Sequence, residues 1–288
     1  MAGSLWNPPD LRGAVAIVTG ASRGAGRSIA AVLGESGAKV YVTGRSTRAA
    51  GRTEGLPGTI DETAEEVVRR GGAGVAVRCD HTVDSDVEAL VERVRREDGR
   101  LDVLVNNAWG GYESHDLATF GAPFWEQPRT RWDAMFTAGV RAHLVMSQVA
   151  APLLLVRARG DRPGLIASTI AWAFGRPLGN AVYDVAKAAL VRLAYVMAEE
   201  LRPHDVAAVA IAPGFMRTER VLAAHAAQPF DLSVTESPEY LGRAVAALAG
   251  DPGLMRRTGE VLTAGELARA YGFTDLDGSQ PEPFRLPG

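Results

Sequence analysis

The sequence predicts a single-domain α/β fold, a doubly wound parallel sheet of about seven strands with helices on both faces. Two observations lead to this fold class. Short apolar runs alternate with helical patterns along nearly the whole chain, and parallel neighbouring strands need crossover connections of this kind. No linker, repeat or low-complexity tract divides the 288 residues, so we expect one domain over residues 1–288.

Local start and stop signals place the elements in order. The first strand is expected at 14–19, where the run AVAIVT ends at Gly20. Thr59 and Glu62 form a capping-box signature at the start of another helix. Strands are expected at 14–19, 38–43, 74–80, 101–107, 164–169, 206–213 and 260–265, helices at 26–37, 61–70, 87–97, near 131–157 and from about 183 to 201, and a loop at 44–58.

Two segments, 109–131 and 219–237, are longer than routine connections, and both follow strand ends. In doubly wound sheets, ligands bind in the crevice beyond the carboxyl ends of the strands. These insertions are therefore candidate walls or lids of a substrate pocket, and disordered surface loops are the alternative.

Composition and charge exclude several classes of function. The net charge of −3 and a pI near 6.0 provide no cationic field for nucleic acid or anionic lipid. Cys79 is the only cysteine, which rules out an intramolecular disulfide and favours a reducing, cytoplasmic location. We find no signal-peptide pattern and no run near the roughly 18 apolar residues of a membrane span, so we expect neither export nor anchoring.

A glycine loop, TGASRGAGRS (19–28), follows the first strand directly and opens a helix. Glycines at 20, 24 and 26 permit a tight turn and the close approach of a pyrophosphate, while the helix N-terminus supplies oriented N–H groups. In this position the pattern favours a dinucleotide-binding, Rossmann-type sheet over a plain turn.

The end of the second strand indicates which dinucleotide binds. NAD sites usually carry an acidic residue there, whereas this chain has Gly44 followed by Arg45. Arg45, Arg23 in the glycine loop and the Ser46 hydroxyl favour the 2′-phosphate of NADP(H). The alternative is that both arginines are solvated surface charges.

Four motifs occur in a characteristic order: TGASRGAG, NNA (106–108), YDVAK (183–187) and PGFMRT (213–218). With them the chain resembles the short-chain dehydrogenase/reductase family from about residue 11 to 265. PFWEQP (123–128) and ELARAYGFTDLDG (266–278) resemble one branch of that family. This resemblance implies an NADPH-dependent carbonyl reductase of steroids or xenobiotics that assembles as a homodimer or homotetramer.

The resemblance also implies roles for cofactor-binding residues. Asp80 would contact adenine, Asn106 and Ala108 would flank the cofactor, Thr218 would meet the nicotinamide carboxamide, and Lys187 would bind the nicotinamide ribose. The residues expected to line the pyrophosphate and the adenosine ribose are Gly20, Ser22, Arg23, Gly24, Ala25 and Gly26.

Tyr183 and Lys187 are four residues apart, so on a helix they lie on one face. A free phenol has a pKa near 10, and a neighbouring ammonium together with an oxidised nicotinamide should lower it toward the working range. The pair therefore predicts a proton donor and its charge partner. Taken alone, the spacing also fits an ordinary helix.

A third hydroxyl should polarise the substrate carbonyl. The family places a serine 12 to 14 residues before the tyrosine, and this chain offers Ser168 and Thr169, 15 and 14 residues upstream. We favour Thr169, with Ser168 as the close alternative. Both hydroxyls would otherwise merely cap a strand end.

Position 139 departs from the family pattern. Counting seven residues from Trp132 places the usual relay asparagine at Gly139, so a water-mediated proton relay through that side chain is in doubt. Either a water on the freed backbone substitutes, or His143 one turn later reaches the channel; we favour a structural role for His143. The other histidines are scattered, and we predict no metal site.

The aromatic residues of the expected pocket suggest an apolar substrate. They are Trp109, Tyr112, Phe124, Trp125 and Trp172. The sequence thus predicts an NADP(H)-dependent oxidoreductase that transfers a hydride between nicotinamide and a carbonyl or secondary alcohol. A nucleotide-sensing binding protein that has lost turnover is the alternative, and Gly139 is its main support.

Overall fold

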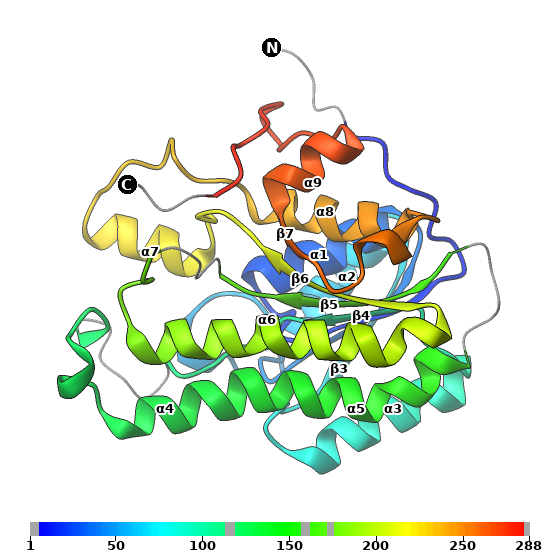
Figure 1. The fold of residues 1–288 in the computed structure, drawn as a ribbon, viewed down its shortest axis with the longest axis horizontal. Helices are drawn as coiled ribbons and strands as arrows, with labels where there is room; N and C mark the ends of the chain where they lie inside the picture. The colour runs from blue at the N-terminus through cyan, green and yellow to red at the C-terminus, as the bar shows by residue number, and fades with distance from the viewer. Residues whose placement is uncertain (1–5, 113–118, 157–161, 172–175, 285–288) are drawn as a thin grey trace.

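The computed structural model describes residues 6–112, 119–156, 162–171 and 176–284, and its centre is one parallel sheet (Figure 1). In these residues the sheet has seven strands in the order β3-β2-β1-β4-β5-β6-β7. The predicted fold class is confirmed. The strands are β1 Val15–Val18, β2 Lys39–Gly44, β3 Ala73–Arg78, β4 Val103–Asn106, β5 Gly164–Thr169, β6 Val206–Ala212 and β7 Val261–Thr263.

The strand order reverses beside β1. The chain runs outward from β1 to β3 and then returns to place β4 on the other side of β1, so Ile17 pairs with both Tyr41 and Leu104. The crossovers of the two halves leave a crevice at the carboxyl ends of β1 and β4. The glycine loop and the NNA motif both begin at that crevice.

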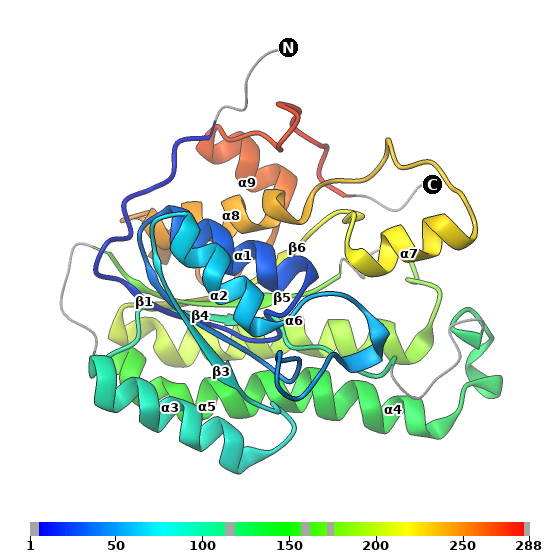
Figure 2. The same cartoon turned by 180° about the vertical axis from the view of Figure 1, so that it is seen from behind.

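Helices cover both faces of the sheet (Figures 1 and 2). Each face has its own apolar core, which explains why most strands are buried along their whole length. One layer contains α1 Gly24–Glu35, α2 Ile60–Arg69, α8 Pro238–Gly250 and α9 Ala264–Tyr271, and the other contains α3 Asp84–Asp98, α5 Ala142–Leu155 and α6 Ala181–Leu201. The short helices are α4 Arg129–Met135 and α7 Glu219–Ala227, with 3₁₀ turns at Thr53–Gly55, Phe124–Glu126, Arg202–His204 and Leu254–Arg257.

The helices α4 and α5 are joined by a π-helical turn, Phe136–Arg141, into one stretch from Arg129 to Leu155. By length and composition this stretch could cross a membrane. Its buried residues, including Met146 and Leu154, pack in the core under the sheet, which accounts for its apolar character.

Side-chain caps fix the helix starts that matter for the site. The predicted capping box of α2 is present, with the Glu62 amide donating to Thr59 Oγ1 and the Thr59 amide donating to Glu62 Oε2. Asn180 caps α6 by accepting from the Tyr183 amide at 2.9 Å. Thr218 caps α7 by accepting from the Val221 amide.

The predicted insertion 219–237 is partly helical. It begins with α7, which lies beyond the carboxyl end of the sheet and belongs to neither helical layer (Figure 2). The described part of the other insertion contains the 3₁₀ turn Phe124–Glu126. Both insertions therefore reach the end of the sheet where the glycine loop lies.

Candidate active site

Two adjoining hollows lie at the carboxyl end of the sheet. The first, here called the groove, has a volume of about 240 Å³ and is lined by the glycine loop and the ends of β2 and β3. The second, here called the cavity, has a volume of about 1650 Å³ and is lined by Thr169, Tyr183 and Lys187 among others. Both have Asn107, Trp109, Tyr112 and Thr218 in their walls. A dinucleotide in the groove would therefore point its far end into the cavity.

The glycine loop forms a cradle that side chains would fill. A Cβ at Gly20, whose φ is +63°, would lie 2.8 Å from the Ala108 Cα. A Cβ at Gly26 would lie 2.5 Å from both Asn107 Nδ2 and the Gly20 carbonyl. Close approach of the backbone and the amides at the N-terminus of α1 suit a pyrophosphate, so the residues present fit a dinucleotide.

Arg23 lies in the groove, but its guanidinium is occupied by the segment after β2. It donates to the Pro57 carbonyl at 3.1 Å and to Ser46 Oγ at 2.9 Å, and its Nη1 lies 3.6 Å from a carboxylate oxygen of Glu54. Arg23 therefore holds this segment in place. Of the two arginines predicted to favour a 2′-phosphate, Arg45 also lines the groove.

The first turn of α7 lines the groove with Glu219 and Arg220. From the sequence, 219–237 is expected as a wall or lid of the substrate pocket, and its contact with the glycine loop is not predicted. The Gly24 amide donates to Glu219 Oε2 at 2.8 Å, and Arg220 forms an ion pair with Glu54. The Arg220 guanidinium also lies 4.7 Å from the centre of the Tyr112 ring. The anchors of α7 thus include both the glycine loop and the segment after β2.

Of the two asparagines in the NNA motif, Asn107 faces the site. Its Nδ2 donates to the carbonyls of Thr19 and Gly20 at 3.0 and 3.1 Å. Asn106 is fully buried and its Nδ2 donates to Ser147 Oγ on α5. The asparagine at the site is therefore Asn107 and not Asn106, which the sequence led us to expect beside the cofactor, because the strand pleat turns successive side chains to opposite faces.

The remaining predicted cofactor residues divide between the two hollows. Asp80 and Ala108 line the groove, Ala25 lines the cavity, and Thr218 lines both. Ser22 and Ser46 also line the groove. Gly26 packs closely against Gly20 and Asn107 and lines neither hollow.

Tyr183 and Lys187 lie in the first two turns of α6 and both line the cavity. The Asn180 cap fixes the start of the helix, and its side chain also donates to the Phe120 carbonyl at 2.7 Å. The Tyr183 ring packs edge to face against Trp109 and Phe120, with centroids 5.4 and 5.7 Å away. The predicted pair is therefore brought together on the cavity wall.

Burial shifts the pKa values of both members of the pair. Burial raises the pKa of Tyr183 above its ordinary value, and burial lowers the pKa of Lys187 to about 7. The Lys187 Nζ lies over the Trp109 ring, 3.5 Å from its centre, and 5.5 Å from the centre of the Tyr183 ring. The ammonium therefore faces an aromatic ring as well as the phenol.

Thr169, not Ser168, has its hydroxyl at the cavity. Thr169 lines the cavity, and its Oγ1 lies 3.3 Å from Asn107 Oδ1. Ser168 is fully buried, and its Oγ has no hydrogen-bond partner in the described part of the chain. The alternation of a strand places the two hydroxyls on opposite faces of β5.

Gly139 lies in the π-helical turn and is buried against Trp109. A Cβ there would lie 2.5 Å from Cζ3 of the indole. His143 Nε2 donates to the Ala108 carbonyl at 3.1 Å, and burial lowers the pKa of this imidazole to about 3. His143 is thus a buried neutral residue that supports the loop after β4, in keeping with the structural role favoured from the sequence.

The predicted aromatic lining is partly correct. Trp109 and Tyr112 line the cavity, together with Phe120. Phe124 and Trp125 do not line the cavity: they are 70% and 72% exposed on the 3₁₀ turn, where their rings contact each other. Trp172 lies outside the described residues.

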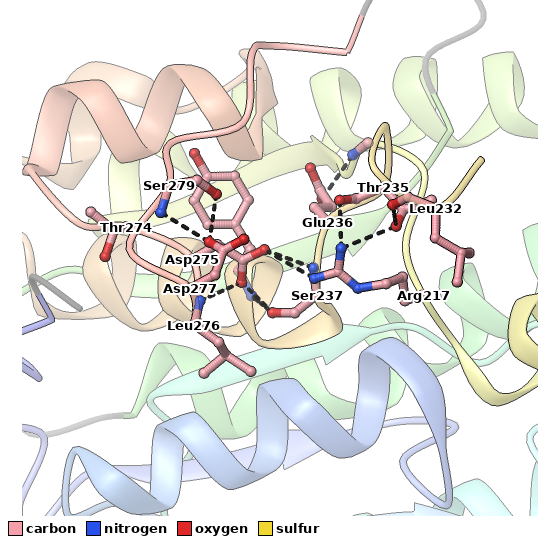
Figure 3. Close-up of polar contacts among 12 residues, drawn as sticks. Arg217, Leu232, Thr235, Glu236, Ser237, Thr274, Asp275, Leu276, Asp277 and Ser279 are labelled. Atoms are coloured by element: carbon pink, nitrogen blue, oxygen red, sulfur yellow. Dashed lines mark hydrogen bonds and ion pairs between the residues drawn. The ribbon is translucent and has the colours of Figure 1, made fainter. Parts of the chain in front are cut away.

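Segments from the C-terminal third of the chain build a large part of the cavity wall, and Figure 3 shows the polar contacts among them. Glu236 accepts from the Gly214 amide at 2.9 Å, and Arg217 donates to the Thr235 carbonyl at 2.8 Å. Asp275 accepts from the Ser237 amide at 2.8 Å and lies 3.8 Å from Arg217. These contacts fix both ends of the 219–235 segment.

No group of three or more His, Cys, Asp or Glu side chains in the described ranges is arranged to hold a metal ion. Cys79 is a buried free thiol at the end of β3, and burial raises its pKa to about 12.

The reversal of strand order, the glycine loop and the cavity beyond it are features of the Rossmann-type class of dinucleotide-binding proteins. A family model described as "short chain dehydrogenase" matches residues 14–228. The chain belongs to the short chain dehydrogenase family, and its oxidoreductase character follows from that membership.

Individual relatives match most of the chain. It is 40% identical over 280 residues to Dehydrogenase/reductase SDR family member 1 of Mus musculus, covering 93% of this chain and 85% of the mouse protein. A short chain dehydrogenase of Mycobacterium thermoresistibile has a TM-score of 0.79 at 27% identity and covers 95% of this chain and 92% of its own. A hydroxysteroid dehydrogenase of Escherichia coli has a TM-score of 0.71 at 26% identity, over 88% and 95%. The predicted resemblance to the family, and to the branch of the mouse protein, is confirmed.

Proposed function

We propose that this protein is an NADP(H)-dependent reductase or dehydrogenase that interconverts an apolar carbonyl compound and the corresponding secondary alcohol. One observation carries the proposal: Tyr183, Lys187 and Thr169 line one cavity that adjoins the glycine-loop groove. A bound nicotinamide would supply or accept the hydride.

Each side chain has a distinct part in this reaction. Tyr183 gives its hydroxyl proton to the developing alkoxide in reduction and takes it back in oxidation. Thr169 donates a hydrogen bond to the substrate oxygen, and Lys187 stabilises the phenolate that Tyr183 leaves.

The groove supports NADP(H) over NAD(H). β2 ends at Gly44, and Arg45 and Ser46 follow it in the groove wall. In NAD sites this position carries an Asp or Glu that binds the ribose hydroxyls. The carboxylate of Glu54, which also lines the groove, is paired with Arg23 and Arg220. Trp109, Tyr112 and Phe120 support an apolar substrate, as does the likeness to a hydroxysteroid dehydrogenase.

The test is loss of NADPH absorbance against a panel of bulky ketones and aldehydes. We expect turnover by the wild type and a loss of at least about a hundredfold in Tyr183→Phe, because general acid catalysis is removed. Tyr195→Phe is the matched control, since Tyr195 lies on the same helix and is 44% exposed.

Three outcomes would count against parts of the proposal. Full activity in Tyr183→Phe removes the assigned acid. NADPH binding without turnover of any panel member favours the nucleotide-sensing alternative. Equal affinity of the wild type for NADPH and NADH removes the 2′-phosphate argument.

A further inference from the structure

Lys187 is a buried lysine whose ammonium is surrounded by aromatic rings. The residue is 6% exposed. No hydrogen bond to its Nζ is found in the described part of the chain, where its polar contacts are the rings of Trp109 at 3.5 Å and Tyr183 at 5.5 Å. A buried ammonium must be stabilised by its neighbours, and the face of the Trp109 ring supplies much of this stabilisation for Lys187.

The position of the indole depends on Gly139. A Cβ at residue 139 would lie 2.5 and 2.8 Å from Cζ3 and Cε3 of Trp109, so any larger residue would displace the ring. On its other side the ring is held edge to face by Tyr183, 5.4 Å between centroids. Trp109 thus contacts both members of the Tyr–Lys pair.

We propose that Trp109 is a positioning residue of this active site: its indole face holds the Lys187 ammonium beside Tyr183, in the space that Gly139 leaves open. The inference rests on the proposed function, which gives the pair its reaction. It also assigns a purpose to the absence of a side chain at position 139.

The charge balance supports this assignment. Burial lowers the pKa of Lys187 to about 7, which works against the ammonium at neutral pH. The ring face attracts only the charged form and so opposes that shift. The other titratable groups near the pair are Tyr112, on the loop after β4, and His143 on α5. Burial lowers the pKa of His143 to about 3, so this imidazole is neutral at the pH of the assay.

The experiment compares Trp109→Leu, Trp109→Phe and Gly139→Ala with the wild type. In Trp109→Leu we expect kcat at neutral pH to fall about tenfold. The midpoint of the change in kcat with pH that follows the titration of Lys187 should move about one pH unit lower, because the ammonium loses the ring that stabilises it. Trp109→Phe keeps a ring face and should recover most of both. Gly139→Ala should reproduce the leucine variant by pushing the indole aside.

A second readout does not depend on turnover. Titration of intrinsic tryptophan fluorescence should show a step as Lys187 loses its proton, and the step should vanish in Lys187→Met and in Trp109→Phe. Trp132→Phe is the matched control, because Trp132 is 47% exposed and stacks on Phe136, away from the pair. It should keep both the step and the rate profile.

The outcomes separate this inference from the proposed function. Unchanged rate profiles in folded Trp109→Leu and Gly139→Ala, or a fluorescence step that survives Trp109→Phe, overturn the positioning role. A step that requires both Trp109 and Lys187 in a protein without turnover supports the positioning and overturns the proposed reaction instead.

Discussion

Glu236 is a buried carboxyl where three chain segments meet, and its ionisation links pH to stability. It is 3% exposed, accepts from the Gly214 amide and lies near Asp275, as Figure 3 shows. Burial raises its pKa to about 7, with Asp275 adding to the shift and Arg217 opposing it. A Cβ on Gly214 would lie 2.5 Å from Glu236 Oε2, so this contact is tight.

We predict that Glu236→Gln stabilises the protein at pH 8 and has little effect at pH 5. The folded-state pKa is raised above the unfolded value, so the stability contributed by the neutral carboxyl is complete below pH 4.5 and is lost as pH rises through about 7. Glutamine has no proton to lose and keeps an acceptor for the Gly214 amide. The gain at pH 8 should be on the order of 2 kcal/mol, measured by urea unfolding.

Glu260→Gln is the control for this comparison, since Glu260 is exposed and pairs only with Arg257 among the described residues. Its effect should be small and independent of pH. A Glu236→Gln protein that is less stable than the wild type at pH 8 would mean that the ionised carboxylate is needed to hold Gly214.

At the scale of elements, the first turn of α7 contacts both the glycine loop and the segment after β2. From the sequence, 219–237 is predicted to be an insertion without a helix, although Thr218 with Glu219 is a usable helix-start signal before VLAAHAA. What no local pattern indicates is that Glu219 reaches the Gly24 amide, 195 residues earlier in the chain.

We predict that Glu219→Gln tightens the binding of ADP-ribose roughly fivefold. A carboxylate on the Gly24 amide takes a donor at the N-terminus of α1 that a pyrophosphate would use, and two anions repel each other there. Isothermal titration calorimetry measures the change. Adenosine 2′-phosphate, which lacks the pyrophosphate, should bind both proteins equally.

Glu199→Gln, on the exposed end of α6 beside Arg202, controls for the loss of one negative charge. It should leave both affinities unchanged. Weaker binding of ADP-ribose by Glu219→Gln would show that Glu219 helps the ligand, for example by holding α7 closed over it.

At the scale of the whole molecule, the sheet could be predicted because its signals are local. Each of these patterns involves only residues that are close in the sequence: the apolar strand runs, the glycine loop and the Thr59 capping box. The structure contains all three. The contacts that shape the site join distant segments instead. The packing of Trp109 against Gly139 depends on the space between two elements that are distant in the sequence, and neither residue by itself predicts this contact.

The lowered pKa values of the buried histidines could not be predicted from local sequence patterns either. His81 and His143 are recognised as buried only in three dimensions, where His81 Nε2 lies 2.8 Å from Thr43 Oγ1 and His143 binds the Ala108 carbonyl. Burial lowers their pKa values to about 4 and about 3. Both are neutral in the folded protein and would take up a proton at mildly acidic pH only on unfolding.

We therefore predict that His143→Gln flattens the acid side of the stability curve. Because the folded pKa is depressed, the stability contributed by neutral His143 is present above the unfolded pKa of about 6.5 and is lost as pH falls toward 3, roughly 2 kcal/mol of it by pH 5. Glu236 acts in the opposite direction over part of this range, so the difference in slope between variants is the measurement. His204→Gln, at an exposed position, should follow the wild type. A His143→Gln curve parallel to both would mean that the pKa of this imidazole is not lowered in the folded protein.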